Sequence, residues 1–203
     1  MNTQYYIQSY CKIKEACITL NDTLVFEDQN NEPKSFFKNA YKNLELKYAK
    51  FFKMDNLSKL SFLGAEFLLQ DNENDAESNT AIVLSNKASS LDTDRKHQDS
   101  IQDKANYFPS PAIFVYTLPN IAIGEISIRH QLKSENAFFV FDTFNAEFLC
   151  NYASVLLDKK KAKSVLCGWV DVDNENYEGF MYLVSRNGKI KHTIKELTNI
   201  YQK

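Results

Sequence analysis

The apolar positions of this chain repeat with two periods, which together predict an alternation of strands and helices. A period of two predicts a first strand in QYYIQSYCKI, which CITL continues after a short break. A loop is predicted next in EDQNNEPKS, which is polar and contains a proline. Between Ser35 and Lys50 the aromatic and apolar residues recur at near-helical spacing, and this predicts a helix.

A second and clearer helix is predicted in MDNLSKLSFLGAEFLLQDN. Its apolar residues fall on one stripe behind two possible capping residues, Asp55 and Asn56. The acidic and amide-rich DNENDAESN then predicts a solvated turn. The β-branched TAIVLSN predicts a strand of the kind that parallel sheets bury, and a strand after a helix indicates a βαβ arrangement.

Two segments in the middle of the chain leave alternatives open. The polar stretch from Lys87 to Tyr107 predicts either a surface loop with an exposed helix or an insertion that faces a partner. From Ile121 to Ile128, four isoleucines fit a strand as well as a helix. Pro119 favours the start of a helix, because its fixed φ suits the first turn.

The pattern becomes regular again after DTFN. An amphipathic helix is predicted there, with Asp142 or Thr143 accepting hydrogen bonds from its first-turn N–H groups. The basic DKKKAK suits the carboxyl end of that helix. Two strands, SVLCGWVDV and GFMYLVSR, are predicted on either side of the turn DNENYE, and TIKELTNIYQ predicts a last helix.

Composition and charge narrow the class of protein. The 203 residues, 44% hydrophobic and 25% charged, suit one domain over residues 1–203. A formal charge of -2 and a pI near 6.0 supply no positive field for nucleic acid or an anionic membrane surface. The sequence shows no secretory signal and no apolar run that could span a bilayer, so we expect a soluble cytoplasmic protein.

The candidate chemical groups are few. The chain contains no C-x-x-C pair and its three histidines are scattered, so we expect no metal site and no cofactor. Its four cysteines lie among apolar neighbours and are expected to be buried reduced thiols: Cys11, Cys17, Cys150 and Cys167. Gly124 and Gly168 are expected to mark close packing of the backbone. Glu125 and Arg129 have the i, i+4 spacing of an ion pair on a helix.

From Ser110 to Val172 the sequence resembles the amino-terminal half of the β-ketoacyl-acyl-carrier-protein synthases, a family with the thiolase fold. The resemblance rests on SP at Ser110, on Asn120 four residues before Gly124, on GEISIRHQL before a strand, and on VLCGW. It implies an α/β, thiolase-like half-fold, with a mixed, mostly parallel sheet covered by helices. It also favours the helix for the isoleucine segment.

The resemblance implies a site without its nucleophile. The family's catalytic cysteine corresponds to Thr143 if the spacing is kept, or to Asn145 if the local pattern is given more weight. The family's two catalytic histidines belong to a second half that this sequence does not contain. A threonine hydroxyl stays protonated near neutral pH unless a base lies beside it, so we expect no catalysis. Asn120, Gly124 and Gly168 would be pocket and packing positions.

Three functions remain open. The first is a non-catalytic accessory subunit that resembles the chain length factors of bacterial aryl polyene or dialkylresorcinol clusters. Such a subunit pairs with a full-length ketosynthase or with itself, in biosynthesis of the fatty-acid or polyene type. Aromatic residues near the nucleophile strand would form the interface, although they would also suit a core: Phe114, Tyr116, Phe138, Phe139 and Phe141.

The second function is a small acyltransferase or thioesterase that uses Thr143, Cys150 or His130. The third is a module that binds acyl-carrier protein or an apolar ligand. In that case four lysines would face the acidic carrier protein, although a solvated helix end is the favoured explanation for them: Lys159, Lys160, Lys161 and Lys163.

Overall fold

The computed structural model describes residues 4–69, 79–105 and 107–203. In these residues eight strands form one sheet, in the order β3-β2-β1-β7-β6-β4-β5, with β8 paired to β1. The strands are β1 (Tyr6–Lys14), β2 (Cys17–Leu20), β3 (Thr23–Glu27), β4 (Thr80–Asn86), β5 (Asn136–Val140), β6 (Ser164–Asp173), β7 (Asn176–Ser185) and β8 (Ile190–Lys191). The turn predicted in DNENDAESN lies outside the described residues, apart from Asn79.

Parallel pairing is confined to one end of the sheet. Strand β4 pairs in parallel with β5 and with β6, whereas every other described pair is antiparallel. The sheet is mixed, as expected, but the prediction that it is mostly parallel is wrong. Tight turns explain the difference, because two-residue connections can join only antiparallel strands. Such turns follow β1 and β2, where Glu15, Ala16, Asn21 and Asp22 have positive φ.

The amino-terminal strands therefore form a meander. The predicted continuation CITL is a strand, but it reverses direction and pairs antiparallel with β1. The next strand, β3, was not predicted. Its residues are almost all exposed, so they show no alternation of apolar and polar positions that would mark a strand.

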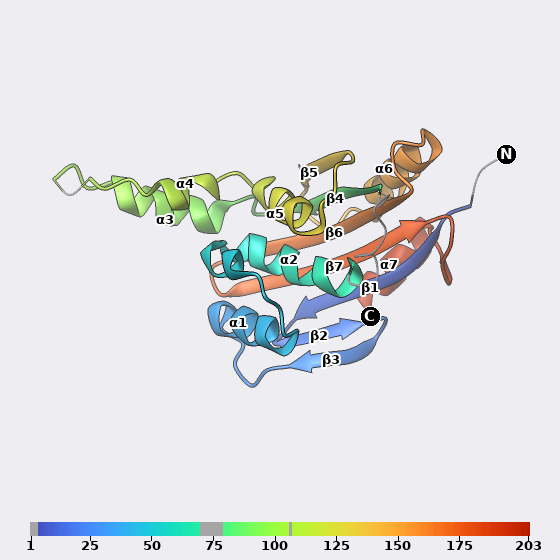
Figure 1. Ribbon diagram of the computed structural model, residues 1–203, viewed down its shortest axis with the longest axis horizontal. Coiled ribbons are helices and arrows are strands. Elements are labelled where there is room, and N and C mark those ends of the chain that lie inside the picture. The colour runs from blue at the N-terminus through green and yellow to red at the C-terminus, as the bar shows by residue number, and fades with distance from the viewer. Residues whose placement is uncertain (1–3, 70–78, 106) are drawn as a thin grey trace.

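Helices cover both faces of the sheet (Figure 1). Helices α1, α2 and α5 lie on one face, and α6 and α7 lie on the other. Helices α3 and α4 project beyond the end of the sheet as an arm (Figure 1). The helices are α1 (Pro33–Asn43), the 3-10 helix η1 (Ala49–Lys53), α2 (Asn56–Leu69), α3 (Leu91–Ile101), α4 (Pro111–Val115), α5 (Ile121–His130), α6 (Ala146–Asp158) and α7 (Ile194–Gln202).

Most of the predicted helices are confirmed. The isoleucine segment is helix α5, and the polar stretch after β4 contains the exposed helix α3. Helix α2 begins behind the predicted cap, because the Asp55 carboxylate accepts a hydrogen bond of 2.9 Å from the Ser58 N–H. The helix predicted from Ser35 to Lys50 ends earlier, at Asn43, and η1 follows it.

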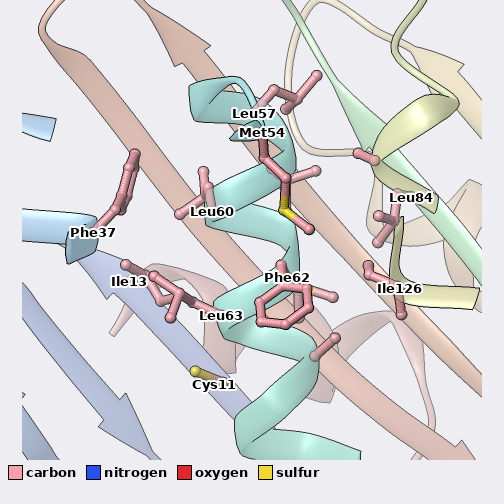
Figure 2. Close-up of a cluster of buried hydrophobic side chains, with 14 of the residues drawn as sticks. Cys11, Ile13, Phe37, Met54, Leu57, Leu60, Phe62, Leu63, Leu84 and Ile126 are labelled. Carbon is pink, nitrogen blue, oxygen red and sulfur yellow. The ribbon is translucent and has the colours of Figure 1, made fainter. Parts of the chain in front are cut away.

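Helix α2 forms the centre of the larger core. Its buried residues Leu60, Phe62 and Leu63 pack between the sheet and the flanking helices α1 and α5 (Figure 2). The helix approaches the sheet closely at Gly64, where an added Cβ would lie 2.5 Å from the Met181 Sδ. A smaller core lies between the opposite face of the sheet and helices α6 and α7.

Candidate functional site

The candidate site lies at the junction between β5 and α6. There the chain from Phe141 to Glu147 borders an open cleft of about 860 Å³, whose other walls are Trp169 on β6 and one side of α7. This is the carboxyl end of the parallel strands, where the ligands of open α/β sheets usually bind. Thr143 is exposed and lines this cleft.

Helix α6 is capped by Asn145. The Asn145 side chain accepts a hydrogen bond of 2.9 Å from the Phe148 N–H, and the Asn145 carbonyl accepts the first helical bond, from Leu149. The prediction that Asp142 or Thr143 caps this helix is therefore wrong. Both residues lie in the preceding loop, too early in the chain to reach the first-turn N–H groups.

No strong base accompanies the Thr143 hydroxyl. Among the described residues that line the cleft there is no histidine, cysteine, lysine or arginine. The predicted candidate base, His130, serves another group, because its Nε2 lies 3.1 Å from the Glu66 Oε1. The pairing of Thr143 with His130 that acyl transfer would require is absent from this cleft.

Glu66 is the centre of a buried ion cluster between α2 and α5. Its carboxylate is fully buried and receives the Arg129 guanidinium, with Nε 2.8 Å from Oε1 and Nη2 3.2 Å from Oε2. Burial raises the pKa of Glu66, but hydrogen bonds from His130 and Arg129 outweigh it and leave the pKa below its usual range. This cluster fastens α5 to α2.

The prediction that Glu125 and Arg129 form an ion pair is wrong, because Glu125 faces η1 and Arg129 faces α2. Glu125 is buried, and its Oε2 lies 2.9 Å from the Lys50 Nζ. Its Oε1 accepts a hydrogen bond of 2.9 Å from the Tyr116 hydroxyl. Tyr116 is only 9% exposed and belongs to the core, so it offers no interface surface, unlike Phe114.

The second catalytic candidate, Cys150, is a buried residue of α6. Its Sγ lies 3.9 Å from the His192 Nδ1, and the His192 Nε2 lies 3.4 Å from the Tyr182 hydroxyl. Burial raises the pKa of Cys150 and lowers the pKa of His192 to about 4. Both groups are therefore neutral near pH 7, and the pair has none of the thiolate character that a nucleophile needs.

The other cysteines are also reduced thiols. Cys11 and Cys167 are buried, as expected, and burial raises the pKa of Cys167 to about 12. Cys17 is only partly buried. No group of three or more histidine, cysteine or acidic side chains in the described residues could hold a metal ion. None of the described helices is long and apolar enough to cross a membrane.

The three predicted pocket and packing positions, Gly168, Gly124 and Asn120, differ in how closely they are packed. At Gly168 an added Cβ would lie 2.7 Å from the Met181 Cγ and 2.8 Å from the Phe180 carbonyl oxygen, so the backbone is closely packed there. At Gly124 an added Cβ would meet nothing within 4 Å, so the close packing expected at this residue is absent. Asn120 is exposed at the start of α5, and its side chain caps nothing.

Aromatic residues gather where β5 faces α6. Phe139 lies in edge contact with Phe148 and Tyr152, at ring-centroid distances of 4.6 and 5.3 Å. Phe141 lies 5.0 Å from Phe148. These half-buried rings lie at β5, the last strand of the sheet. Phe138 packs on the other face of β5, against the larger core. The lysines after α6 are all exposed, and Lys161 lies 3.6 Å from the Glu135 carboxylate.

Neither a protein-family model nor a curated protein sequence matches the chain. Solved structures do share its fold. The chain matches the ishigamide ketosynthase/chain length factor with a TM-score of 0.65 and 17% identity, over 90% of this chain and 62% of that one. It matches a complex of a ketosynthase with its chain length factor from Xenorhabdus doucetiae with a TM-score of 0.62 and 10% identity, over 98% of this chain and 90% of that one.

A third match is a type II polyketide synthase acyl-carrier protein in complex with its ketosynthase. The TM-score is 0.57 and the identity 11%, over 91% of this chain and 63% of that one. The chain therefore spans less than two thirds of the first and third structures, but nine tenths of the matched chain in the Xenorhabdus complex. These matches confirm the ketosynthase-like α/β fold that the resemblance implied.

Proposed function

We propose that this chain is a non-catalytic, cytoplasmic accessory subunit, similar to a chain length factor, that pairs with a full-length β-ketoacyl synthase. The observation that carries the proposal is the junction between β5 and α6. It keeps the strand, loop and helix of a ketosynthase-like fold, but it presents the exposed hydroxyl of Thr143. A partner synthase would supply the missing thiolate and imidazoles.

The chemistry of the junction supports this proposal. Thioester formation needs a nucleophile whose activated form is substantially populated. Among the described residues that line the cleft, none offers Thr143 an imidazole or amine, and Cys150 with His192 forms a neutral, buried pair. The small-enzyme alternative therefore has no group in the described residues that is both accessible and activated.

The free edge of β5 supports the proposed pairing. Glu135 accepts from the Ile82 N–H and Phe141 donates to the Asn86 carbonyl, so every second residue between them also bonds to β4. The intervening residues, among them Asn136 and Val140, direct their N–H and C=O groups away from the sheet. An open edge of this kind is a template for a strand of another protein.

Apolar surface flanks this edge. Val155 on α6 is 55% exposed on the face that carries Phe139, Phe148 and Tyr152, and Val140 is 53% exposed on the opposite face of β5. Half-buried aromatic and exposed aliphatic side chains next to unpaired backbone groups leave apolar surface in contact with water. They are the usual composition of the buried centre of an interface.

The projecting arm supplies a second apolar surface. Phe108 before α4, Phe114 within it and Leu118 after it are 76%, 58% and 53% exposed. The arm is fastened at its base, because the Thr93 hydroxyl donates to the Asp55 carboxylate at 2.8 Å. A fixed arm with an apolar surface directly after the polar stretch from Lys87 to Tyr107 supports the interpretation that this polar stretch belongs to a partner-facing insertion.

Co-expression with the full-length ketosynthases of the same genome tests the pairing. We expect one of them to co-elute with the chain at the size of a heterodimer. Val140→Pro removes one outward N–H of β5 without touching its bonds to β4, and should abolish the complex. Val140→Ala keeps the backbone and should retain it. A chain that stays monomeric and binds none of these synthases would overturn the proposal.

A further inference from the structure

We propose that the cleft beside Thr143 binds a small organic cation. At about 860 Å³, the cleft has the size of a small-molecule site. Its walls combine aromatic rings with acidic side chains, and this combination favours a positively charged ligand. The inference concerns the isolated chain and does not depend on the pairing proposed above. The rings that line the cleft are those of Phe141, Phe144, Trp169 and Tyr201.

The charged groups of the cleft are all acidic. Asp142 and Glu147 line it, and no lysine, arginine or histidine is found among its described lining residues. Two further carboxylates, Asp171 and Glu178, lie opposite each other on β6 and β7, on the same face of the sheet as Trp169. The negative field that results disfavours fatty acids, phosphates and other anions, and favours an ammonium group.

Tyr201 connects the cleft to these strand carboxylates. Its hydroxyl donates a hydrogen bond of 2.9 Å to the Glu178 carboxylate. Burial, and then the charge of Glu178, raise the pKa of Tyr201, so the ring stays neutral. Because the hydroxyl proton is engaged, this side chain offers a ligand its ring and the lone pairs of its oxygen, both of which attract a cation.

The amino terminus of α6 opposes a cation, since its free N–H groups carry a partial positive charge. Two features reduce this effect. The Asn145 side chain occupies the Phe148 N–H, and Glu147 lies in the first turn, where a carboxylate offsets the helix dipole. Asp142 then leaves the mouth of the cleft with a negative charge.

The aromatic walls add a second attraction. The rings of Phe144 and Tyr201 lie 4.2 Å apart, and Phe144 also contacts Phe180 at 5.4 Å, which fixes this wall in place. The face of an aromatic ring attracts a cation. Trp169 is only 4% exposed, so the half-buried rings of Phe144 and Tyr201 supply most of this attraction. A ligand that combines an ammonium group with an apolar body would match both the rings and the carboxylates.

Trp169 allows a direct test, because it is the only tryptophan of the chain and it lines the cleft. Its fluorescence is followed while the isolated chain is titrated with 2-phenylethylammonium. The neutral 2-phenylethanol and the anionic 3-phenylpropanoate serve as matched controls of the same shape. We expect a saturable change with the cation, and binding about tenfold weaker or absent for the other two compounds.

Two variants tie that signal to the cleft. Asp142→Asn and Glu147→Gln should each weaken binding of the cation by about threefold to tenfold, because each removes one nearby charge. Glu45→Gln, which changes an exposed carboxylate after α1, should leave the affinity unchanged. Asp142 caps no helix, so its substitution should not disturb folding. The proposal is overturned if 2-phenylethylammonium gives no saturable change, if the neutral or anionic compound binds as tightly, or if both variants bind normally.

Discussion

The Cys150 Sγ lies 3.9 Å from the His192 Nδ1, although 42 positions separate the two residues in the sequence. The arrangement has the composition of a catalytic dyad without its electrostatics. Burial disfavours both the thiolate and the imidazolium, so the neutral pair is the stable one. The contact instead joins α6 to the segment that leads into α7.

The buried thiol should be inert toward alkylation. In the native protein we expect iodoacetamide to leave Cys11, Cys150 and Cys167 unmodified, and to modify only the partly exposed Cys17. Intact-mass analysis of the native protein would show at most one adduct, and the unfolded protein would show four. Rapid modification of Cys150 at neutral pH would contradict the assignment of a buried neutral pair.

His192 should make stability depend on pH. Its pKa is about 4 in the folded protein and that of an ordinary histidine in the unfolded chain, so the unfolded state binds more protons as the pH falls between these values. The free energy of unfolding should therefore decrease by about 2 kcal/mol between about pH 7 and pH 5 through this group.

The matched comparison is His192→Asn, measured by urea unfolding at both pH values. Other titrating groups affect both proteins alike, so the variant should lose about 2 kcal/mol less than the parent chain over this interval. An equal loss in the two proteins would show that His192 is not held neutral by burial.

Three glycines differ in how much space surrounds them, so their substitution by alanine gives a graded test of the packing. Gly168→Ala would force its Cβ against the Met181 side chain and the Phe180 carbonyl, and should destabilise the protein by about 1–3 kcal/mol. Gly64→Ala meets only the flexible Met181 side chain and should cost less. Gly124→Ala meets nothing and should stabilise α5 by about 0.5–1 kcal/mol. Urea unfolding measures all three, and a Gly168→Ala variant as stable as Gly124→Ala would contradict this order.

The sequence predicts the elements whose apolar residues are buried in the core. Helix α2 presents an apolar stripe, and β4 is buried along its whole length, so both were recognisable. Strand β3 is not predicted by the sequence, because its residues are almost all exposed. The isoleucines of α5 fit the period of a strand as well as that of a helix, and only packing against the neighbouring helices selects the helix. Local pattern is a good guide only where an element packs against the core.

The side-chain partners within the candidate site could not be predicted from spacing. The His130 Nε2 contacts the Glu66 carboxylate on another helix, and Glu125 pairs with Lys50 rather than with Arg129. These contacts depend on how α5 packs against α2, which the sequence of α5 alone does not contain. The identity of the residue at the junction between β5 and α6, by contrast, depends only on the sequence, which has Thr143 there and no cysteine.

The central claim is that the chain cannot form a thioester or ester by itself. Intact-mass analysis after incubation with the octanoyl thioester of N-acetylcysteamine tests this most directly, with Thr143→Cys as a control that places an exposed thiol in the cleft. With the partly exposed Cys17 replaced by serine in both proteins, we expect no octanoyl adduct on the parent chain and an adduct on the Thr143→Cys variant. An octanoyl group recovered on Thr143 of the native chain, with no other protein present, would contradict the account.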